Sequence, residues 1–465
     1  MKRWFTWNVL FRLHEFAKGH DTYAMLRAME TADRFTSAQL EELRSAKLRE
    51  LIEYSYAHVP FVRGRMKRAG IEPSDIRTPE DLARMPLMRK KDVREHRAEL
   101  RSEIATQMAS FTTGGSTGEP LIFDLSKRRV GSRVACGQRT SRWWGTSVGD
   151  RELAIWGAPV ELKRQDLIRN IRDRILSSRL LSAFELNEAT ISRYLDILER
   201  SDCRQLFGYP SALYLVCHQA QKEGRNLRSL GLKVAFVTGE VLFPYQRELI
   251  AETLNCPVAN GYGGRDTALI AHECPQGGMH VLADAVVLEL LDSSGRPVAP
   301  GEPGEIVITD LYSHEAPFIR YATGDTAILA SRRCPCGRAL PLLDRIEGRS
   351  NDCIVAPDGR IINSLALVYS LREIEGIEKF QVRQRAVDRF SVQLMCNQQF
   401  SRNAEERIRT SWNKLLRSAV EVTFEYLQEF PIEKSGKFRH VVSEVSAAQL
   451  AAGDRQVAPV AGSRN

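Results

Sequence analysis

The sequence predicts an α/β protein with a large N-terminal domain of several sheets, followed by a small α+β domain. Between residues 109 and 350, short apolar runs alternate with stretches of helical periodicity, which is typical of mixed α/β architectures. After Arg349 the chain changes to shorter strand and helix patterns, and this change indicates a separate domain. A chain of 465 residues accommodates two or three domains, and an apolar content of 43% is ordinary for a globular protein.

The first 108 residues are predicted to form a mostly helical leader of the large domain. The stretch 37–56 has a helix cap at Ser37. Its apolar residues recur at helical spacing on one side: Leu40, Leu43, Leu48, Leu51 and Ile52. Further along, residues 234–239 predict a buried strand and residues 243–254 a helix. Residues 286–291 and 304–309 predict two strands around a turn rich in glycine and proline.

The C-terminal part is predicted to hold a domain over residues 349–450 and a disordered tail over residues 451–465, so the large domain spans residues 1–348. A hairpin is expected around Pro357, Asp358 and Gly359, because these are turn-forming residues. The tail is rich in Ala, Gly, Ser and Pro, and such a composition buries too little apolar surface to fold.

Charge and composition narrow the classes of partner. The net charge of +8 comes from 66 basic and 58 acidic residues that are mixed along the chain, which suits an enzyme with anionic substrates. The sequence has no nucleic-acid-binding signature, and no apolar run reaches the 18 residues of a membrane span. We therefore expect small-molecule substrates and no nucleic-acid partner. The sequence does not decide the oligomeric state, and a homodimer is one option.

The N-terminal segment is basic and aromatic. Residues 1–12 have neither a long apolar core nor a small-residue cleavage site, so no secretory signal is predicted and a cytoplasmic location is expected. Packing of this segment on the rest of the protein is the favoured interpretation. The alternative is peripheral contact with a membrane, as a short amphipathic helix on its surface.

The run from Thr112 to Pro120 predicts a phosphate-binding loop. Its first seven residues comprise four hydroxyl-bearing side chains and three glycines. Glycines allow positive φ and a close approach of the backbone to a ligand, and successive N–H groups form an anion-binding concavity. A flexible linker is the alternative, although the strand-like residues 121–123 follow at once. The spacing is not that of a Walker-type loop.

Four further segments follow in a fixed order: residues 260–266 (NGYGGRD), 320–325 (RYATGD), 345–352 (RIEGRSND) and 433–439 (EKSGKFR). Each alone is weak, since Tyr-Gly and Thr-Gly-Asp occur in many turns. Together, behind the phosphate loop, they resemble the motifs of the adenylate-forming enzyme superfamily over residues 35–447. Residues 57–61 (AHVPF) and the Cys-x-Cys pair at 334–336 resemble its phenylacetate–CoA ligase-like branch, which includes capsular polysaccharide biosynthesis homologues.

The resemblance implies a two-step reaction. A small-molecule carboxylate attacks ATP to give acyl-AMP and pyrophosphate, and a thiol, usually coenzyme A, then displaces AMP. The small domain would be mobile about a hinge at Asn351 or Asp352. Three alternatives stay open: an amine acceptor such as an amino sugar in surface-polysaccharide or secondary metabolism, adenylyl transfer to a cofactor, and a degenerate adenylate-binding protein without activity.

The resemblance also implies roles for individual residues. The expected catalytic residues are Lys437, Thr113 and Asp266, with Lys437 bridging the carboxylate and the α-phosphate and Asp266 helping to bind Mg²⁺. Asp325 would accept hydrogen bonds from the ribose, a charge-assisted geometry. The full set expected to bind ATP or AMP is Thr113, Gly115, Ser116, Thr117, Gly118, Gly239, Glu240, Asn260, Gly261, Tyr262, Gly263, Asp325, Arg345 and Lys437.

Three positions depart from the family pattern. Arg265 stands where a hydroxyl is usual, and either compensates phosphate charge or marks a changed reaction. The lysine usual near the end of the phosphate loop is missing, since Glu119 and Leu121 stand there. Residues 355–362 lack the Gly-x-x-x-Pro run common in phenylacetate–CoA ligases, and this weakens the prediction of the acceptor more than that of adenylation.

A metal site is the second functional prediction. Cys274, His280, Cys334 and Cys336 supply three thiols and one imidazole, the ligand set of a closed, structural zinc site. Clustered cysteines in a reducing compartment suggest a metal rather than disulfides. The alternative is a set of buried or free cysteines, and His272 is a reserve ligand.

Overall fold

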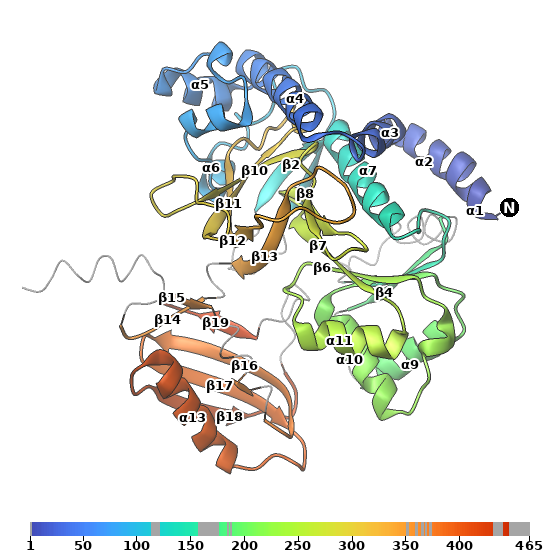
Figure 1. Cartoon of the computed structure of the whole chain (residues 1–465), viewed down its shortest axis with the longest axis vertical. Coiled ribbons are helices and arrows are strands. Elements are labelled where there is room, and N and C mark those ends of the chain that lie inside the picture. The colour runs from blue at the N-terminus through green and yellow to red at the C-terminus, as the bar shows by residue number, and fades with distance from the viewer. Residues whose placement is uncertain are drawn as a thin grey trace, which may run out of the picture. The chain divides into compact units, whose positions relative to one another are not determined.

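The computed structural model (Figure 1) describes residues 2–112, 121–156, 176–183, 186, 188–349, 353–358, 361–363, 367, 370–371, 374–430 and 440–445. The chain divides into two compact units, one that spans Met1–Ile346 and one that begins at Glu347. The α/β prediction is confirmed, with a large sheet in the first unit and a small α+β fold in the second. Within the described ranges, every helix is too short or too polar to cross a membrane.

The leader is helical, as predicted. Its elements are α1 (Lys2–Phe5), the π-helix η1 (Thr6–Phe11), α2 (Arg12–Lys18), α3 (Thr22–Ala32), α4 (Ser37–His58), α5 (Pro60–Ala69), the 3₁₀ helices η2 (Pro73–Asp75) and η3 (Pro79–Arg84), and α6 (Lys90–Glu95). The cap of α4 is Thr36 rather than Ser37. The Thr36 hydroxyl accepts the Gln39 N–H, and the Gln39 side chain accepts the Thr36 N–H in return, which is a capping box.

An eleven-stranded sheet forms the centre of the first unit, in the order β10-β11-β12-β13-β9-β8-β7-β6-β5-β3-β4. The strands are β3 (Glu152–Trp156), β4 (Ser178–Ser182), β5 (Gln205–Gly208), β6 (Val234–Thr238), β7 (Val258–Gly264), β8 (Ala268–Glu273), β9 (Met279–Val281), β10 (Val286–Leu291), β11 (Pro303–Asp310), β12 (Tyr321–Leu329) and β13 (Leu342–Arg349). The predicted strands over 234–239, 286–291 and 304–309 are confirmed as β6, β10 and β11. A separate antiparallel pair, β1 (Met108–Thr112) and β2 (Ile122–Ser126), flanks residues 113–120.

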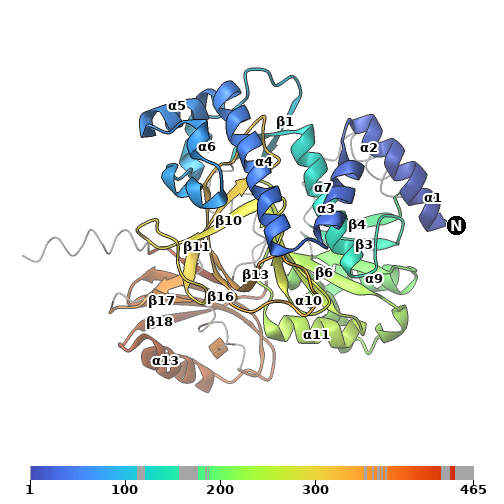
Figure 2. The same cartoon turned by 45° about the horizontal axis from the view of Figure 1, so that its top comes forward.

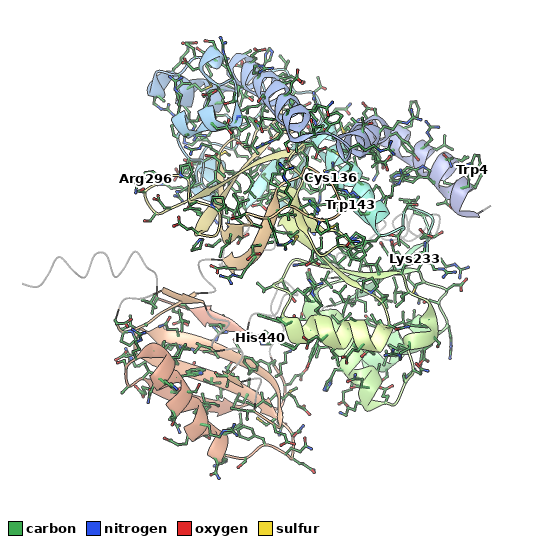
Figure 3. The ribbon with its side chains drawn as sticks, in the orientation of Figure 1. Trp4, Cys136, Trp143, Lys233, Arg296 and His440 are labelled. Carbon is green, nitrogen blue, oxygen red and sulfur yellow. The ribbon has the colours of Figure 1, made fainter. Side chains whose placement is uncertain are left out.

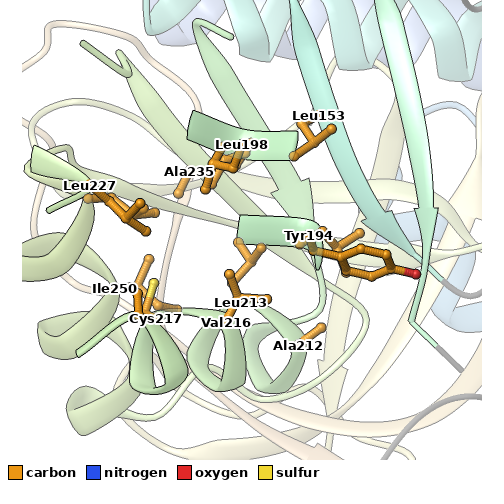
Figure 4. Packing of buried hydrophobic residues seen from close by; sticks show 14 of the residues in the cluster. Leu153, Tyr194, Leu198, Ala212, Leu213, Val216, Cys217, Leu227, Ala235 and Ile250 are labelled. Carbon is orange, nitrogen blue, oxygen red and sulfur yellow. The ribbon is translucent and has the colours of Figure 1, made fainter. Parts of the chain in front are cut away.

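The strands β3 to β7 are parallel and follow the doubly wound order 2-1-3-4-5. One face of these strands is covered by α9 (Glu188–Glu199), α10 (Pro210–Lys222) and α11 (Pro244–Leu254), whose apolar side chains form one buried cluster (Figure 4). Successive side chains of a strand alternate between its faces. Ala235 and Val237 accordingly join this cluster, whereas Val234 and Phe236 pack on the other face beside Trp144, which follows α7 (Lys127–Trp143). The helix α7 also packs along α3 (Figure 2).

Arg320 joins the helical leader to the sheet. Its side chain is buried and forms an ion pair with Glu289 of β10, with an N–O distance of 2.7 Å. The same guanidinium donates to the carbonyls of Ala83 and Met85 in the leader, at 3.1 and 2.7 Å. Buried charges are tolerated when they are paired and fully hydrogen-bonded, so Arg320 fixes the leader against the strand that leads to Asp325.

The second unit contains a sheet in the order β18-β17-β16-β19 and one described long helix, α13 (Asn403–Leu416). Its strands are β16 (Ile377–Ala386), β17 (Arg389–Cys396), β18 (Glu421–Tyr426) and β19 (Val441–Ser443). Trp412 of α13 is fully buried, contacts Phe390 edge to face and donates its ring N–H to Ser370 at 2.7 Å. The predicted hairpin is the antiparallel pair β14 (Cys353–Val355) and β15 (Ile361–Asn363). The predicted tail lies outside the described residues.

Candidate functional site

A hydrogen bond joins Tyr262, near the end of β7, to Asp325, in the middle of β12. The Tyr262 hydroxyl donates to a carboxylate oxygen of Asp325 at 2.6 Å, although three other strands lie between β7 and β12 in the sheet order. Burial, and then the negative charge of Asp325, raise the pKa of Tyr262 well above its usual value. The phenol therefore stays protonated and holds the carboxylate of Asp325 in one orientation.

Asp325 is also held by its own turn. Its backbone N–H donates to the Thr323 hydroxyl at 3.1 Å, and that hydroxyl donates to the Ile306 carbonyl at 3.0 Å. Gly324 between them has φ of +81°, a conformation that suits glycine. The Thr-Gly-Asp run therefore forms a fixed feature within β12, with a half-buried carboxylate at its end.

Asp266 lies beside this pair, in the turn between β7 and β8. Its carboxylate accepts the Tyr321 hydroxyl at 3.0 Å, and its carbonyl accepts a hydrogen bond from the buried guanidinium of Arg129. Gly263 makes this turn possible, because a Cβ there would lie 2.1 Å from the Ala268 carbonyl oxygen. The predicted residues Asp266, Tyr262 and Asp325 thus converge at one end of β7.

Arg265 connects this cluster to the predicted phosphate loop. Its guanidinium donates to the carbonyl of Thr112 at 3.2 Å, at the residue where β1 ends. The positive charge of Arg265 therefore lies where the Gly/Ser/Thr run begins, and such a charge attracts anionic groups such as phosphate. Five predicted loop residues, together with the predicted catalytic lysine, lie outside the described residues: Thr113, Gly115, Ser116, Thr117, Gly118 and Lys437.

The other predicted nucleotide ligands lie on strands of the large sheet or directly after one of these strands. Gly239 follows β6 directly, and Thr238 pairs with Gly261 of β7 in the parallel ladder. Glu240 accepts the backbone N–H of Ser211, at 3.1 Å, at the start of α10. The Asn260 N–H donates to Glu273 at 2.8 Å, and the exposed Arg345 lies in β13. Ligands of parallel α/β sheets bind at the carboxyl ends of the strands, which is where Gly239 and Tyr262 lie.

Two residues of the cluster were not predicted from the sequence. Arg129 comes four residues before Arg133 on α7, and this one-turn spacing of basic residues behind a phosphate loop was an available signal. Tyr321 lies inside the RYATGD run, but its bond to Asp266 depends on how β12 meets the β7–β8 turn. A sequence pattern holds no information on that contact.

The four predicted metal ligands lie together. Their ligand atoms are all within 4.8 Å of one another, with Sγ of Cys274 and Cys334 at 3.5 Å and Sγ of Cys336 at 3.1 Å from Nε2 of His280. The antiparallel pairing of β9 with β13 places His280 opposite Leu342, near Cys334 and Cys336. The reserve ligand His272 is not in this group, and its Nδ1 contacts the Glu273 carbonyl at 2.9 Å instead.

This cluster fits a zinc ion. Three cysteine sulfurs and one imidazole nitrogen are the ligands of closed tetrahedral sites, and Zn–S and Zn–N bonds of roughly 2.0–2.3 Å suit ligand atoms at this spacing. His280 Nδ1 faces the Leu340 carbonyl at 3.3 Å, which leaves Nε2 directed at the cysteines. A Cβ at Gly278 would lie 2.7 Å from Sγ of Cys334, so the missing side chain leaves the space that the sulfur occupies.

Comparisons with known proteins identify relatives of this chain. Residues 354–444 match the family model of the CapK C-terminal domain. The chain is 25% identical over 339 residues to phenylacetate-coenzyme A ligase of Thermus thermophilus, which covers 68% of this chain and 72% of that relative. It is 21% identical over 419 residues to protein CapK of Staphylococcus aureus, which covers 87% and 90% of the two chains.

Solved structures with the same fold include 2-hydroxyisobutyryl-CoA ligase in the postadenylation state, in complex with R3-HIB-AMP. It has a TM-score of 0.72 and 20% identity, and the alignment covers 92% of this chain and 94% of that chain. The ATP-bound MatB of Rhodopseudomonas palustris is more distant, with a TM-score of 0.52 and 13% identity over 75% of this chain and 68% of that one. The predicted resemblance is thereby confirmed: the chain is a homologue of the phenylacetate–CoA ligases and of CapK, and it has the fold of adenylate-forming CoA ligases.

Proposed function

We propose that the chain is an AMP-forming acid–thiol ligase, which activates a carboxylate with ATP and transfers the acyl group to a thiol, with coenzyme A as the expected acceptor. The observation that supports it is the Tyr262–Asp325 hydrogen bond at the end of β7, beside Asp266 and next to the start of the Gly/Ser/Thr run. The names of the phenylacetate–CoA ligase relatives support the same activity.

In the proposed reaction, a carboxylate oxygen attacks the α-phosphorus of ATP and pyrophosphate leaves. The thiol sulfur then attacks the acyl carbon and AMP leaves. Phosphoryl transfer of this kind requires positioning and charge neutralisation. We assign the ribose hydroxyls to Asp325, the adenine to the strands that carry Gly239 and Tyr262, and Mg²⁺ to the carboxylate of Asp266. Arg265, together with the amides of the 113–120 loop, would neutralise the phosphates, and Lys437 would contact the α-phosphate.

The direct test is carboxylate-dependent exchange of ³²P between pyrophosphate and ATP, run across a panel of carboxylic acids. Acyl-AMP formation predicts exchange with at least one acid. Coenzyme A should then convert the acyl-AMP into a thioester. Exchange without thioester, but with amide formation on an amino sugar, would favour the amine acceptor. Pyrophosphate release that requires no acid would favour adenylyl transfer to a cofactor. ATP binding without exchange for any acid would identify an adenylate-binding protein.

The second candidate is an amine acceptor, in keeping with the resemblance to capsular polysaccharide biosynthesis homologues. The CapK C-terminal domain model matches residues 354–444, and the CapK relative aligns over 87% of this chain. The Thermus ligase aligns over 68%. The acceptor assay should therefore include amino sugars beside coenzyme A.

Replacement of Lys437 by alanine should lower kcat for acyl-AMP formation by about 10²–10³-fold while ATP still binds. The reason is that the lysine would stabilise charge that develops only in the transition state. The pyrophosphate exchange assay measures the loss, and calorimetry measures ATP binding. Lys414→Ala, at an exposed lysine of α13, is the matched control and should keep its activity. Equal exchange rates in Lys437→Ala and the unmodified chain would contradict the assigned role.

Replacement of Asp325 by alanine should raise the KM for ATP by about 10- to 100-fold, because a charge-assisted hydrogen bond contributes about 1.5–3 kcal/mol. The interaction exists in both ground and transition states, so KM should change at least as much as kcat. Tyr262→Phe should cause a smaller increase, since it removes only the group that orients the carboxylate. Asp202→Ala, at an exposed surface carboxylate, is the control. Unaltered ATP affinity in Asp325→Ala would reduce this residue to a loop-forming role.

We also propose that Cys274, His280, Cys334 and Cys336 hold a structural zinc ion. Purified protein should then contain about one zinc per chain. Cys334→Ser and Cys336→Ser should lose the metal and lower the melting temperature, because metal binding contributes to folding. The control is Cys256→Ser, at a buried cysteine outside the cluster. Metal analysis of protein purified without chelators would contradict the site if it found no zinc.

A further inference from the structure

The N-terminal helix exposes an unusual set of apolar side chains. The structure has seven exposed large apolar residues among those described, and four of them lie within residues 2–18. These four are Trp4, Phe5, Leu13 and Phe16, with exposed fractions of 66%, 47%, 60% and 83%. Single exposed apolar residues are normal on a protein surface, but a concentration of them marks an interaction site. Figure 3 shows Trp4 at the free end of this helix.

A π-helical segment brings these four residues to one side of the helix. The flanking residues Phe5 and Arg12 have helical backbone angles, so α1, η1 and α2 form one continuous helix. On a regular α-helix each residue turns by about 100°, and residues nine positions apart, such as Trp4 and Leu13, would point in opposite directions. With the i→i+5 bonding over Thr6–Phe11, each residue turns about the helix axis by less than in an α-helix. Over these six residues the difference adds up to roughly a quarter of a turn, so α2 is rotated by that amount relative to its position in a regular α-helix. The arc that holds all four side chains narrows from about 180° to about 100°.

The opposite side of the helix is fixed to the protein. Thr6, Phe11 and Glu15 are buried there. Trp7 and Phe11 stack on each other at 5.2 Å between ring centroids, and the Arg142 guanidinium of α7 lies 4.2 Å from the Trp7 ring. The Tyr23 hydroxyl of α3 donates to the Trp7 carbonyl. The favoured prediction, that this segment packs on the protein, therefore accounts for one side of the helix only.

The net charge of this segment indicates the kind of partner that it would bind. Residues 2–18 contain the cations Lys2, Arg3, Arg12 and Lys18, and the only acid is Glu15. Glu15 lies on the inner side, where the Thr22 hydroxyl donates to it, and Arg12 is exposed. A two-fold contact between two copies of this helix would bring the same cations together, and like charges repel. An anionic lipid surface attracts them, and Trp, Phe and Leu are the residues that enter the headgroup region.

We propose that this helix lies in the plane of an anionic membrane surface, with Trp4, Phe5, Leu13 and Phe16 inserted among the lipids. The inner side keeps its contacts with α3 and α7, so the enzyme body would be held at the membrane. The mode of binding is that of an in-plane amphipathic helix that is rich in basic residues and exposes an aromatic face.

The test is co-sedimentation of the full-length chain with vesicles of phosphatidylcholine mixed with phosphatidylglycerol, and with vesicles of phosphatidylcholine alone. We expect binding to the anionic vesicles that weakens as salt is added, because salt screens the attraction. The triple variant Trp4→Ser, Leu13→Ser, Phe16→Ser should bind on the order of tenfold or more weakly. A matched triple variant at exposed apolar residues elsewhere, Ile104→Ser, Ile122→Ser, Tyr426→Ser, should bind like the unmodified chain.

Two measurements distinguish a variant that is misfolded from one that is folded but has lost its membrane-binding side chains. The triple variant should retain its melting temperature and its circular dichroism spectrum, because the changed side chains are exposed. Trp4→Phe should still bind but should lose the vesicle-induced blue shift of tryptophan fluorescence. Equal binding by both triple variants, or equal binding to neutral and anionic vesicles, would overturn the proposal. A dimer in light scattering without lipid, which the Trp4/Leu13/Phe16 variant dissociates, would identify a second copy as the partner instead.

Discussion

The buried ion pair between Arg129 and Asp310 is the interaction on which the site depends. The two side chains meet at 2.6 Å, with 3% and 2% of their surfaces exposed. Removing one partner from such a pair leaves an uncompensated buried charge and costs about 3–5 kcal/mol. The same guanidinium donates to the carbonyl of Asp266, and the Phe318 ring lies 4.6 Å from it. One side chain thus fixes α7, the end of β11 and the β7–β8 turn relative to one another.

The strand β8 connects the two candidate sites. On one side Gly261 of β7 pairs with His272, and on the other side His272 pairs with His280 of β9. The strand β7, which carries Tyr262, and the strand β9, which carries His280 of the cysteine–histidine cluster, are therefore both neighbours of β8. A metal in the cluster would stabilise β9 and β13 where their pairing is short, since only two residue pairs join them. Such a metal would therefore influence the position of Tyr262 through β8, without direct contact with this residue.

Local patterns account for what the sequence could predict. The bounds of β6, α11, β10 and β11 follow from apolar periodicity and from turn residues, which act over a few positions. The residues of the cysteine–histidine cluster were identifiable because cysteines are few, although the contact of Cys274 with Cys334 joins residues 60 positions apart. The bonds of Arg129 to Asp310 and of Tyr321 to Asp266 span 181 and 55 positions. No local signal encodes such pairs, and they follow only from the assembled sheet.

The π-helix in the leader also makes the register of this segment sensitive to chain length. A π turn contains one residue more than the α turn it replaces, so loss of a single residue between Thr6 and Phe11 would restore regular α-helical bonding. The part of the helix that follows the deletion would keep its position, because Phe11 and Glu15 are buried against the rest of the protein. Trp4 and Phe5 would then swing around the axis, away from Leu13 and Phe16. A one-residue deletion would therefore divide the apolar face in two while leaving every one of its side chains in the sequence.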